Sequence, residues 1–191
     1  MNPASRAFAH LRSAMEQSGV RYAIGGSWAS TAFGEARFTN DVDIVADFTP
    51  QSLDEFLSHL PVTFYVDSGE ARNALRLGSP FNVIYMPIAF KFDFFPARAF
   101  PLGLQELDRA VLLPGSGLSD IPTPFVTPED ILLAKLHWFH AGGEVSDVQW
   151  RDVQGIIRSE TGILDLNYLE QNAAKLGIAA LLKKAFEVIQ K

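Results

Sequence analysis

The stretch that decides the fold runs from Tyr22 to Asp47 and reads YAIGGSWASTAFGEARFTNDVDIVAD. A short apolar run, 22–24, breaks at a Gly-Gly pair, and the chain restarts at Ser27 as a predicted helix. Ser27 suits a helix N-cap because its hydroxyl can accept a hydrogen bond from an unpaired amide of the first turn. The stretch ends in a strand-like run, 41–45. Its order of strand, turn, helix and strand is typical of an α/β fold.

Two features of this stretch point to chemistry. Gly25 and Gly26 leave backbone amides uncovered, so an anion can approach these amides and the helix N-terminus together. Asp41 and Asp43 are two residues apart, and on a strand their carboxylates therefore lie on one face. Neighbouring carboxylates repel each other unless a cation lies between them, and oxygen ligands suit a hard cation such as Mg²⁺.

The order and spacing of these features resemble the signature of the nucleotidyltransferase superfamily, which has the DNA polymerase β-like fold. The matching residues are Gly26-Ser27, a gap from 28 to 40, and Asp41-Val42-Asp43-Ile44. The longer motif, with Arg37-Phe38-Thr39-Asn40 before the aspartates, is most similar to that of small bacterial members, including abortive-infection toxin-type nucleotidyltransferases. The motif covers about a seventh of the chain.

The resemblance implies an activity and its partners. A nucleoside monophosphate would pass from an NTP to an acceptor hydroxyl, with release of pyrophosphate. Gly25, Gly26 and Ser27 would hold the triphosphate, and Asp41 and Asp43 would bind Mg²⁺ or Mn²⁺. The acceptor stays open between tRNA, a protein and a small molecule, and a cognate antitoxin is a further possible partner.

A third carboxylate is expected from the strand 88–95. Its phenylalanines at 90, 92 and 94 form one apolar face, and Asp93 lies on the opposite face. A two-metal phosphoryl-transfer site usually needs a third carboxylate, which in this superfamily comes from a later strand beside the Asp-x-Asp strand. We interpret Asp93 as that residue. The alternative is a surface aspartate paired with Lys91 or Arg98.

Two cations are further candidates for the nucleotide-binding site. Arg37 is either a phosphate or carboxylate clamp, for which a guanidinium is suited, or a structural cation that is solvated in its loop or paired with Glu35. Lys135 lies among apolar residues in a predicted helix from 128 to about 140, similar to a lysine-bearing helix of small superfamily members. It either faces the triphosphate or is an exposed lysine whose stem covers apolar surface.

Composition excludes several classes of protein. The 191 residues are 48% hydrophobic, which excludes general disorder, and no apolar run is long enough to span a membrane. The chain has no cysteine, which removes disulfides and thiolate metal sites and agrees with a cytoplasmic setting. A net charge of −6 argues against a broad nucleic-acid-binding surface.

The expected fold is α/β (α+β), with a mixed sheet of about five strands, flanking helices and a C-terminal helical bundle. A nucleotidyltransferase-like core is predicted at 1–113, a Pro- and Gly-rich linker at 114–126, and the helical region at 127–191. The segment 67–77 is ambiguous, although a helix there would carry Arg72 and Arg76 as a basic edge. The alternative to an enzyme is a catalytically silent binding module of a toxin–antitoxin or regulatory complex, because a fold alone does not determine activity.

Overall fold

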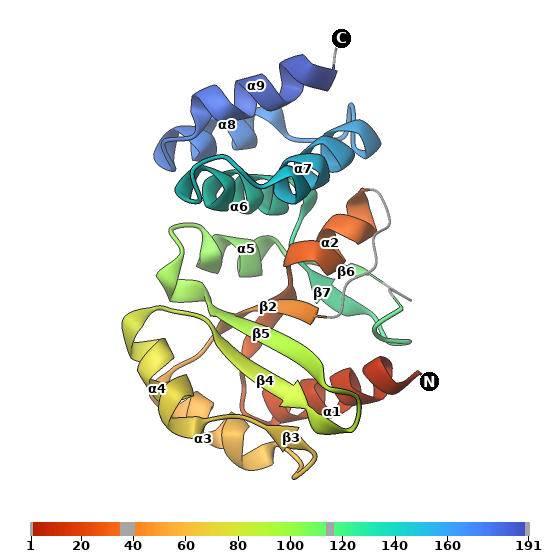
Figure 1. The fold of residues 1–191 in the computed structure, drawn as a ribbon, viewed down its shortest axis with the longest axis vertical. Helices are drawn as coiled ribbons and strands as arrows, with labels where there is room; N and C mark the ends of the chain where they lie inside the picture. The colour runs from red at the N-terminus through yellow and green to blue at the C-terminus, as the bar shows by residue number, and fades with distance from the viewer. Residues whose placement is uncertain (1, 35–40, 114–116, 190–191) are drawn as a thin grey trace. The chain divides into compact units, whose positions relative to one another are not determined.

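The computed structural model describes residues 2–34, 41–113 and 117–189. Its residues group into two compact units, whose elements are labelled in Figure 1. The first unit comprises Met1–Gly25 and Thr39–Phe125, and the second comprises Gly26–Phe38 and Val126–Lys191. The boundaries that the sequence suggests around 114–126 stay a prediction.

The first unit is built on a mixed sheet. Among the described residues, the sheet has seven strands in the order β3-β4-β5-β2-β1-β7-β6. The strands are β1 (Arg21–Ile24), β2 (Asp41–Asp47), β3 (Phe64–Tyr65), β4 (Phe81–Tyr85), β5 (Phe90–Pro96), β6 (Val111–Leu113) and β7 (Thr123–Phe125). Strand β2 is parallel to β5, and β1 is parallel to β7, whereas the other neighbouring strands are antiparallel. The predicted α/β class with a mixed sheet is confirmed, but the expectation of about five strands was too low.

The helices of the first unit surround this sheet. They are α1 (Pro3–Gln17), α3 (Pro50–His59), α4 (Ser68–Leu77), η1 (Met86–Ile88), η2 (Ala97–Ala99) and α5 (Gly103–Arg109). Helix α4 begins at the cap Asp67, whose carboxylate accepts a hydrogen bond from the Glu70 amide, and it ends at Gly78 with φ of 68°. A positive φ costs glycine little, so this residue ends the helix without strain. The ambiguous segment 67–77 is therefore a helix.

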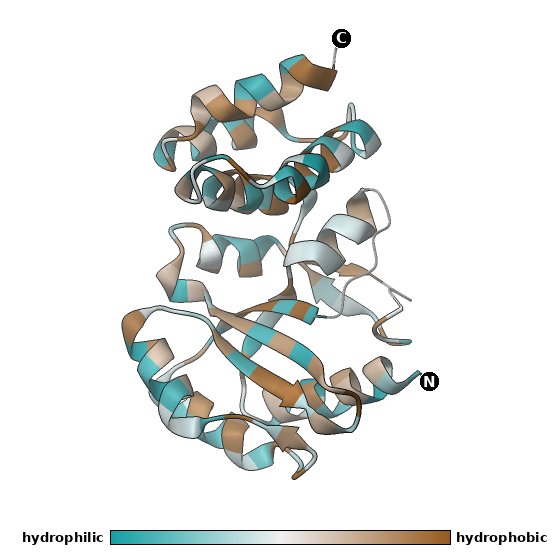
Figure 2. Cartoon of the chain, in the orientation of Figure 1, coloured by the Kyte–Doolittle hydropathy of each residue, from teal (hydrophilic) through white to brown (hydrophobic). Residues whose placement is uncertain are grey.

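The core of the first unit explains why β2 and β5 form. Apolar and polar residues alternate along both strands, and the alternation is visible as brown and teal bands in Figure 2. Val42, Ile44, Phe92 and Phe94 are fully buried on one face of the sheet. Phe94 stacks against Phe81 with ring centroids 5.2 Å apart. The polar residues of both strands are consequently turned to the other face.

The second unit is helical. It contains α2 (Gly26–Phe33), α6 (Pro128–Ala141), α7 (Asp147–Ser159), α8 (Leu166–Lys175) and α9 (Ala179–Ile189). Helix α6 starts as the sequence predicts, with Thr127 as N-cap and Pro128 in the first turn. The predicted C-terminal helical bundle is confirmed, and α2 packs with α6 and α7 in the same unit. Among the described residues, no helix combines the length and the apolar character that crossing a membrane requires.

Candidate active site

The polar faces of β2 and β5 bring three carboxylates together. In the parallel register, Asp43 lies opposite Asp93 and Asp41 lies opposite Lys91. Residues in register on neighbouring parallel strands project to the same face, and such strands lie about 4.8 Å apart. The structure therefore places Asp93 beside the Asp-x-Asp pair, as the proposed third carboxylate requires.

Asp93 is the most buried member of this group. Its residue is 9% exposed, and its Oδ1 atom is buried without a hydrogen-bond partner among the described residues. Its other oxygen, Oδ2, lies 2.6 Å from the Lys91 ammonium. A buried carboxylate oxygen without a partner loses its solvation and gains nothing in return, so it is a favourable position for a cationic ligand.

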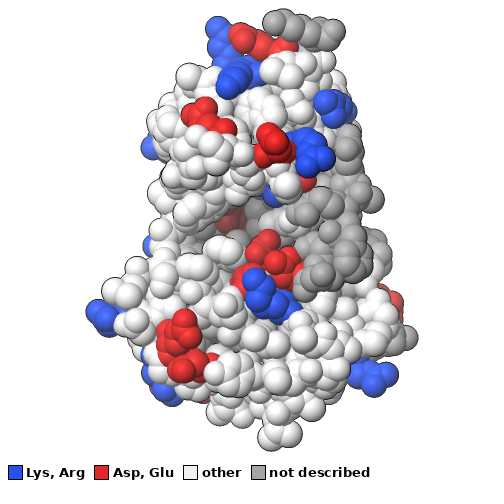
Figure 3. Space-filling view, viewed as in Figure 1, with Lys and Arg blue, Asp and Glu red and all other residues white. Residues whose placement is uncertain are grey.

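Lys91 is the cation that the carboxylates share. Its Nζ lies 2.6 Å from Asp93 Oδ2 and 3.8 Å from Asp41 Oδ2. The hydrogen bond to Asp93 raises the pKa of Lys91 above its ordinary value of 10.5. Burial opposes this rise, while the charges of Asp93, Asp41 and Asp43 add to it. Figure 3 shows acidic side chains with a basic side chain beside them over these strands.

The donor set fits a hard divalent cation only in part. Three carboxylates supply the oxygen ligands that Mg²⁺ prefers, and the partnerless Asp93 oxygen is available as one of them. Within the ranges that the structure describes, however, no three acidic or histidine side chains are gathered closely enough to form a complete metal site. A metal here would therefore need further oxygen ligands from a substrate.

The Gly25–Ser27 turn follows β1 directly. The Gly25 amide donates a hydrogen bond to the Asp43 carbonyl at 2.9 Å, which fixes the end of β1 to the carboxylate strand. Gly26 has φ of 52°, a conformation that favours glycine, and it is the first residue of α2. The helix thus begins one residue earlier than the sequence suggested, and Ser27 lies in its first turn. Arg37, the remaining predicted residue near this turn, lies outside the described residues.

Lys135 has a partner within the second unit. Its ammonium lies 2.7 Å from Asp152 Oδ2 of α7, and the two side chains are only 11% and 13% exposed. Neither alternative from the sequence, a triphosphate ligand or an exposed lysine, included this ion pair. Because charges of opposite sign balance each other in a nearly buried position, the pair joins α6 to α7.

No family model matches the sequence, and no curated protein matches it. The chain is similar to the solved structure of an antigenic nucleotidyltransferase-like protein from Paracoccidioides brasiliensis, with 17% identity and a TM-score of 0.52 over 97% of this chain and 94% of that one. The chain has a nucleotidyltransferase-like fold. Two structures of the antibiotic-resistance factor ANT(2'')-Ia, one in complex with adenylyl-2''-tobramycin, match at 16% identity with TM-scores of 0.48. Both matches cover 97% of this chain. They cover 94% of the chain in the first ANT(2'')-Ia structure and 99% of the chain in the complex with adenylyl-2''-tobramycin.

Within this fold, sequence reasoning missed the roles of two residues. Lys91 entered only as a possible partner of Asp93, although its alternation with Asp93 along one strand places both on the same face. Asp152 was not identified as a partner of Lys135, because nothing local to α7 indicates that it meets a residue of α6.

The Lys91 ion pairs predict a pH-dependent contribution to stability. Lys91→Met should lower the free energy of unfolding by at most about 1 kcal/mol at pH 8, since Lys91 is 40% exposed and solvent screens its interactions. The folded-state pKa of Lys91 is raised, so its contribution is complete below pH 10.5 and is lost as the pH rises through the folded-state pKa. Urea denaturation of both proteins in EDTA, at pH 8 and pH 11, measures the difference.

Lys183→Met is the matched control for this experiment, because Lys183 is 79% exposed and lies 3.8 Å from Glu187. It should change stability little at either pH. A deficit of Lys91→Met that stayed constant up to pH 11 would show that packing of the side chain, not its charge, was lost.

Proposed function

We propose that this protein is a metal-dependent nucleotidyltransferase that moves a nucleoside monophosphate from an NTP to an acceptor hydroxyl, with release of pyrophosphate. The observation that carries the proposal is the parallel pairing of β2 and β5, which places Asp41, Asp43 and Asp93 on one face of the sheet. The nucleotidyltransferase-like fold supports it. Three carboxylates on one face repel one another, and a bound divalent cation would relieve the part of this repulsion that Lys91 leaves.

The carboxylates are proposed to hold Mg²⁺ or Mn²⁺ together with the triphosphate. When bound, the metal supplies positive charge that neutralises the phosphates and polarises the bond to the leaving group. Asp41 and Asp43 are its protein ligands in this proposal, with Asp93 contributing to the same site. Because the protein offers an incomplete set of ligands, affinity for the metal alone should be weak and should rise with NTP present.

The remaining residues act on the substrates. Asp93 orients the acceptor hydroxyl and takes its proton, for which a carboxylate oxygen without a partner is suited. Gly25, Gly26 and Ser27 bind the phosphates through backbone amides and the start of α2. Arg37 and Lys135 neutralise charge on the triphosphate. Lys135 could do this only if it exchanged Asp152 for a phosphate oxygen or bound both at once.

The proposed acceptor is a tRNA, a protein or a small molecule. The proposed location is the cytoplasm, which the absence of cysteine suggests. Purified protein incubated with each α-labelled NTP, Mg²⁺ and cell extract should transfer label from one NTP to the acceptor. Asp41→Asn should abolish labelling, whereas Asp54→Asn, an exposed acid on α3, should leave it unchanged. Equal labelling by wild type and Asp41→Asn would contradict the proposal.

A catalytically silent binding module is the second candidate, and Lys91 is the observation that favours it. An ammonium 2.6 Å from Asp93 already neutralises part of the acidic cluster, so a silent protein would have no need of metal there. Such a module, paired with an antitoxin or a regulatory partner, would label nothing with any NTP. Manganese binding measured by calorimetry separates the two candidates: the enzyme gains manganese affinity when a non-hydrolysable NTP analogue is added, and the silent module does not.

A further inference from the structure

A cavity of about 640 Å³ opens in the first unit, away from the carboxylates. Its walls come from α3, α4, η2 and the segment that follows β2. Phe48, which lines it, is five residues beyond Asp43, or roughly 16 Å along an extended strand. The cavity therefore lies at the opposite end of β2 from the proposed reaction centre. Its volume is within the range of small-molecule binding sites, roughly 300–1,000 Å³.

The cavity combines an apolar floor with a basic rim. Phe48, Leu53 and Ala97 are almost fully buried and line the floor. Three arginines line the rim, whereas the only acidic residue among the lining residues is Asp54. The lining residues thus carry a net charge of +2 in a protein whose net charge is −6, although Asp47, outside the lining, offsets the charge of Arg98. An arginine cluster of this kind attracts an anion, and the exposed side chain of Leu77, another lining residue, can contact an uncharged part of the same ligand.

The arginines come from two elements that are held together. Arg72 and Arg76 are four residues apart on α4 and lie on the same face of this helix. Arg98 lies in η2. A Cβ atom placed on Gly78, at the end of α4, would lie 3.0 Å from Ala99 Cβ, so the end of α4 abuts η2. Arg76 and Arg98 are each within two residues of this contact.

Arg76 is the guanidinium with the most free donors. It donates to the neutral side-chain oxygen of Asn73 at 2.7 Å and has no carboxylate partner among the described residues. Arg72 donates through Nε to Asp54 at 2.7 Å, in a pair whose side chains are both more than half exposed. Exposed pairs contribute about 0–1 kcal/mol, so a ligand can compete for Arg72 at little cost.

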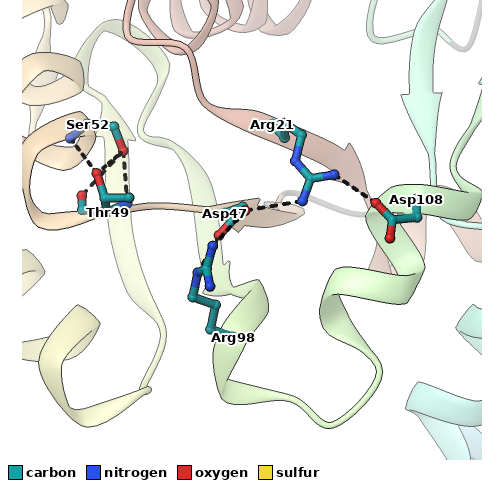
Figure 4. Close-up of polar contacts among 6 residues, drawn as sticks. All are labelled: Arg21, Asp47, Thr49, Ser52, Arg98 and Asp108. Atoms are coloured by element: carbon teal, nitrogen blue, oxygen red, sulfur yellow. Dashed lines mark hydrogen bonds and ion pairs between the residues drawn. The ribbon is translucent and has the colours of Figure 1, made fainter.

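Arg98 shows how this rim binds an anion. It binds the Asp47 carboxylate through Nε at 2.8 Å and through Nη2 at 3.3 Å, the forked arrangement that guanidinium groups also form with phosphate. Figure 4 shows Asp47 between Arg98 and Arg21, which in turn reaches Asp108. Arg21 thus shares the charge of Asp47, and the second Nη of Arg98 has no partner among the described residues.

We propose that this cavity binds a small organic phosphate, a phosphate ester with an apolar group, without the help of a metal. A phosphate ester carries a charge of about −1.5 to −2 at pH 7, opposite in sign to the net charge of the lining. The ester's apolar group contacts the exposed side chain of Leu77, which also lines the cavity. This site is separate from the proposed nucleotidyl-transfer site, and the proposal does not depend on the proposed function.

Phenyl phosphate is the probe for this site, titrated into ¹⁵N-labelled protein in EDTA. Amide shifts are expected in the segments 72–78 and 97–99, with saturable binding. Inorganic phosphate should bind more weakly, since it lacks the ring, and the neutral analogue benzyl alcohol should not bind. Arg76→Gln should weaken phenyl phosphate binding roughly tenfold, as expected for the loss of one charge-assisted hydrogen-bonding group.

Arg6→Gln is the matched control, because Arg6 is exposed on α1 and does not line the cavity. Its affinity for phenyl phosphate should equal that of the wild type. Arg72→Gln is the second test variant and should weaken binding in the same direction as Arg76→Gln. The proposal fails if phenyl phosphate shifts only residues 25–27, if it shifts none, or if both rim variants bind as tightly as Arg6→Gln.

Discussion

Replacing Asp93 with asparagine is expected to lower nucleotidyl transfer about a thousandfold, within the range measured for loss of a general base, while the protein stays folded. Asparagine keeps the shape of the side chain but cannot accept the proton of the acceptor hydroxyl. It also removes one of the three carboxylates on the shared face of β2 and β5. Nucleotide binding should change little, because Asp41 and Asp43 remain.

Two opposing effects should leave the stability of Asp93→Asn near that of the wild type. The neutral amide relieves repulsion with Asp43, which lies opposite it in the register. It also weakens the 2.6 Å contact with Lys91, which is charge-assisted in the wild type. We expect the net change to be about 1 kcal/mol or less. Thermal melts with and without Mg-NTP, beside the labelled-transfer assay, measure both quantities.

Asp47→Asn is the matched control for Asp93→Asn. Asp47 lies on the same strand and face as Asp43, but it is bound by Arg21 and Arg98. The control should therefore melt at a lower temperature than the wild type and transfer label at the same rate. If Asp93→Asn instead behaved like Asp47→Asn, with lower stability and normal transfer, Asp93 would be a structural residue and another group would act as base.

Local periodicity was enough to find the strands that carry the carboxylates. The patterns at 41–45 and 88–95 identified both strands, observed at Asp41–Asp47 and Phe90–Pro96, and the face on which Asp93 lies. Strand β7 and helix α5 were not identified. The first has three residues with a proline at its centre, and the second has seven residues in a Pro- and Gly-rich region. Elements this short contain too few residues for a period to be recognised, and their formation depends on pairing or packing with the rest of the unit.

The partners of charged side chains were harder to predict than the strands. Lys91 and Asp93 are two apart on one strand, so their pairing was among the alternatives. Lys135 and Asp152 are on different helices, and their contact depends on how α6 packs against α7. Helical periodicity indicates which face of each helix is apolar, but it does not determine which polar residues meet across the interface.

The Lys135–Asp152 pair leads to the second large effect. Lys135→Met should lower the free energy of unfolding by about 3 kcal/mol, because it removes the ammonium that lies 2.7 Å from the nearly buried Asp152 carboxylate. The double variant Lys135→Met/Asp152→Leu should recover most of this loss, since two apolar side chains of similar volume can pack where the ion pair was. Urea denaturation of the wild type, both single variants and the double variant gives the coupling energy.

The same four proteins decide whether Lys135 also binds the triphosphate. If Lys135 only joins α6 to α7, NTP affinity should be normal in the double variant, because the helices are again well packed. If it neutralises phosphate charge, as we propose, NTP affinity should fall roughly tenfold in both Lys135→Met and the double variant, whatever their stability. Calorimetry with Mg²⁺ and a non-hydrolysable NTP analogue, well below the melting temperature of each variant, separates the two outcomes. If the double variant regains stability but not NTP affinity, Lys135 binds the nucleotide. If it regains both, Lys135 acts only at the interface between α6 and α7.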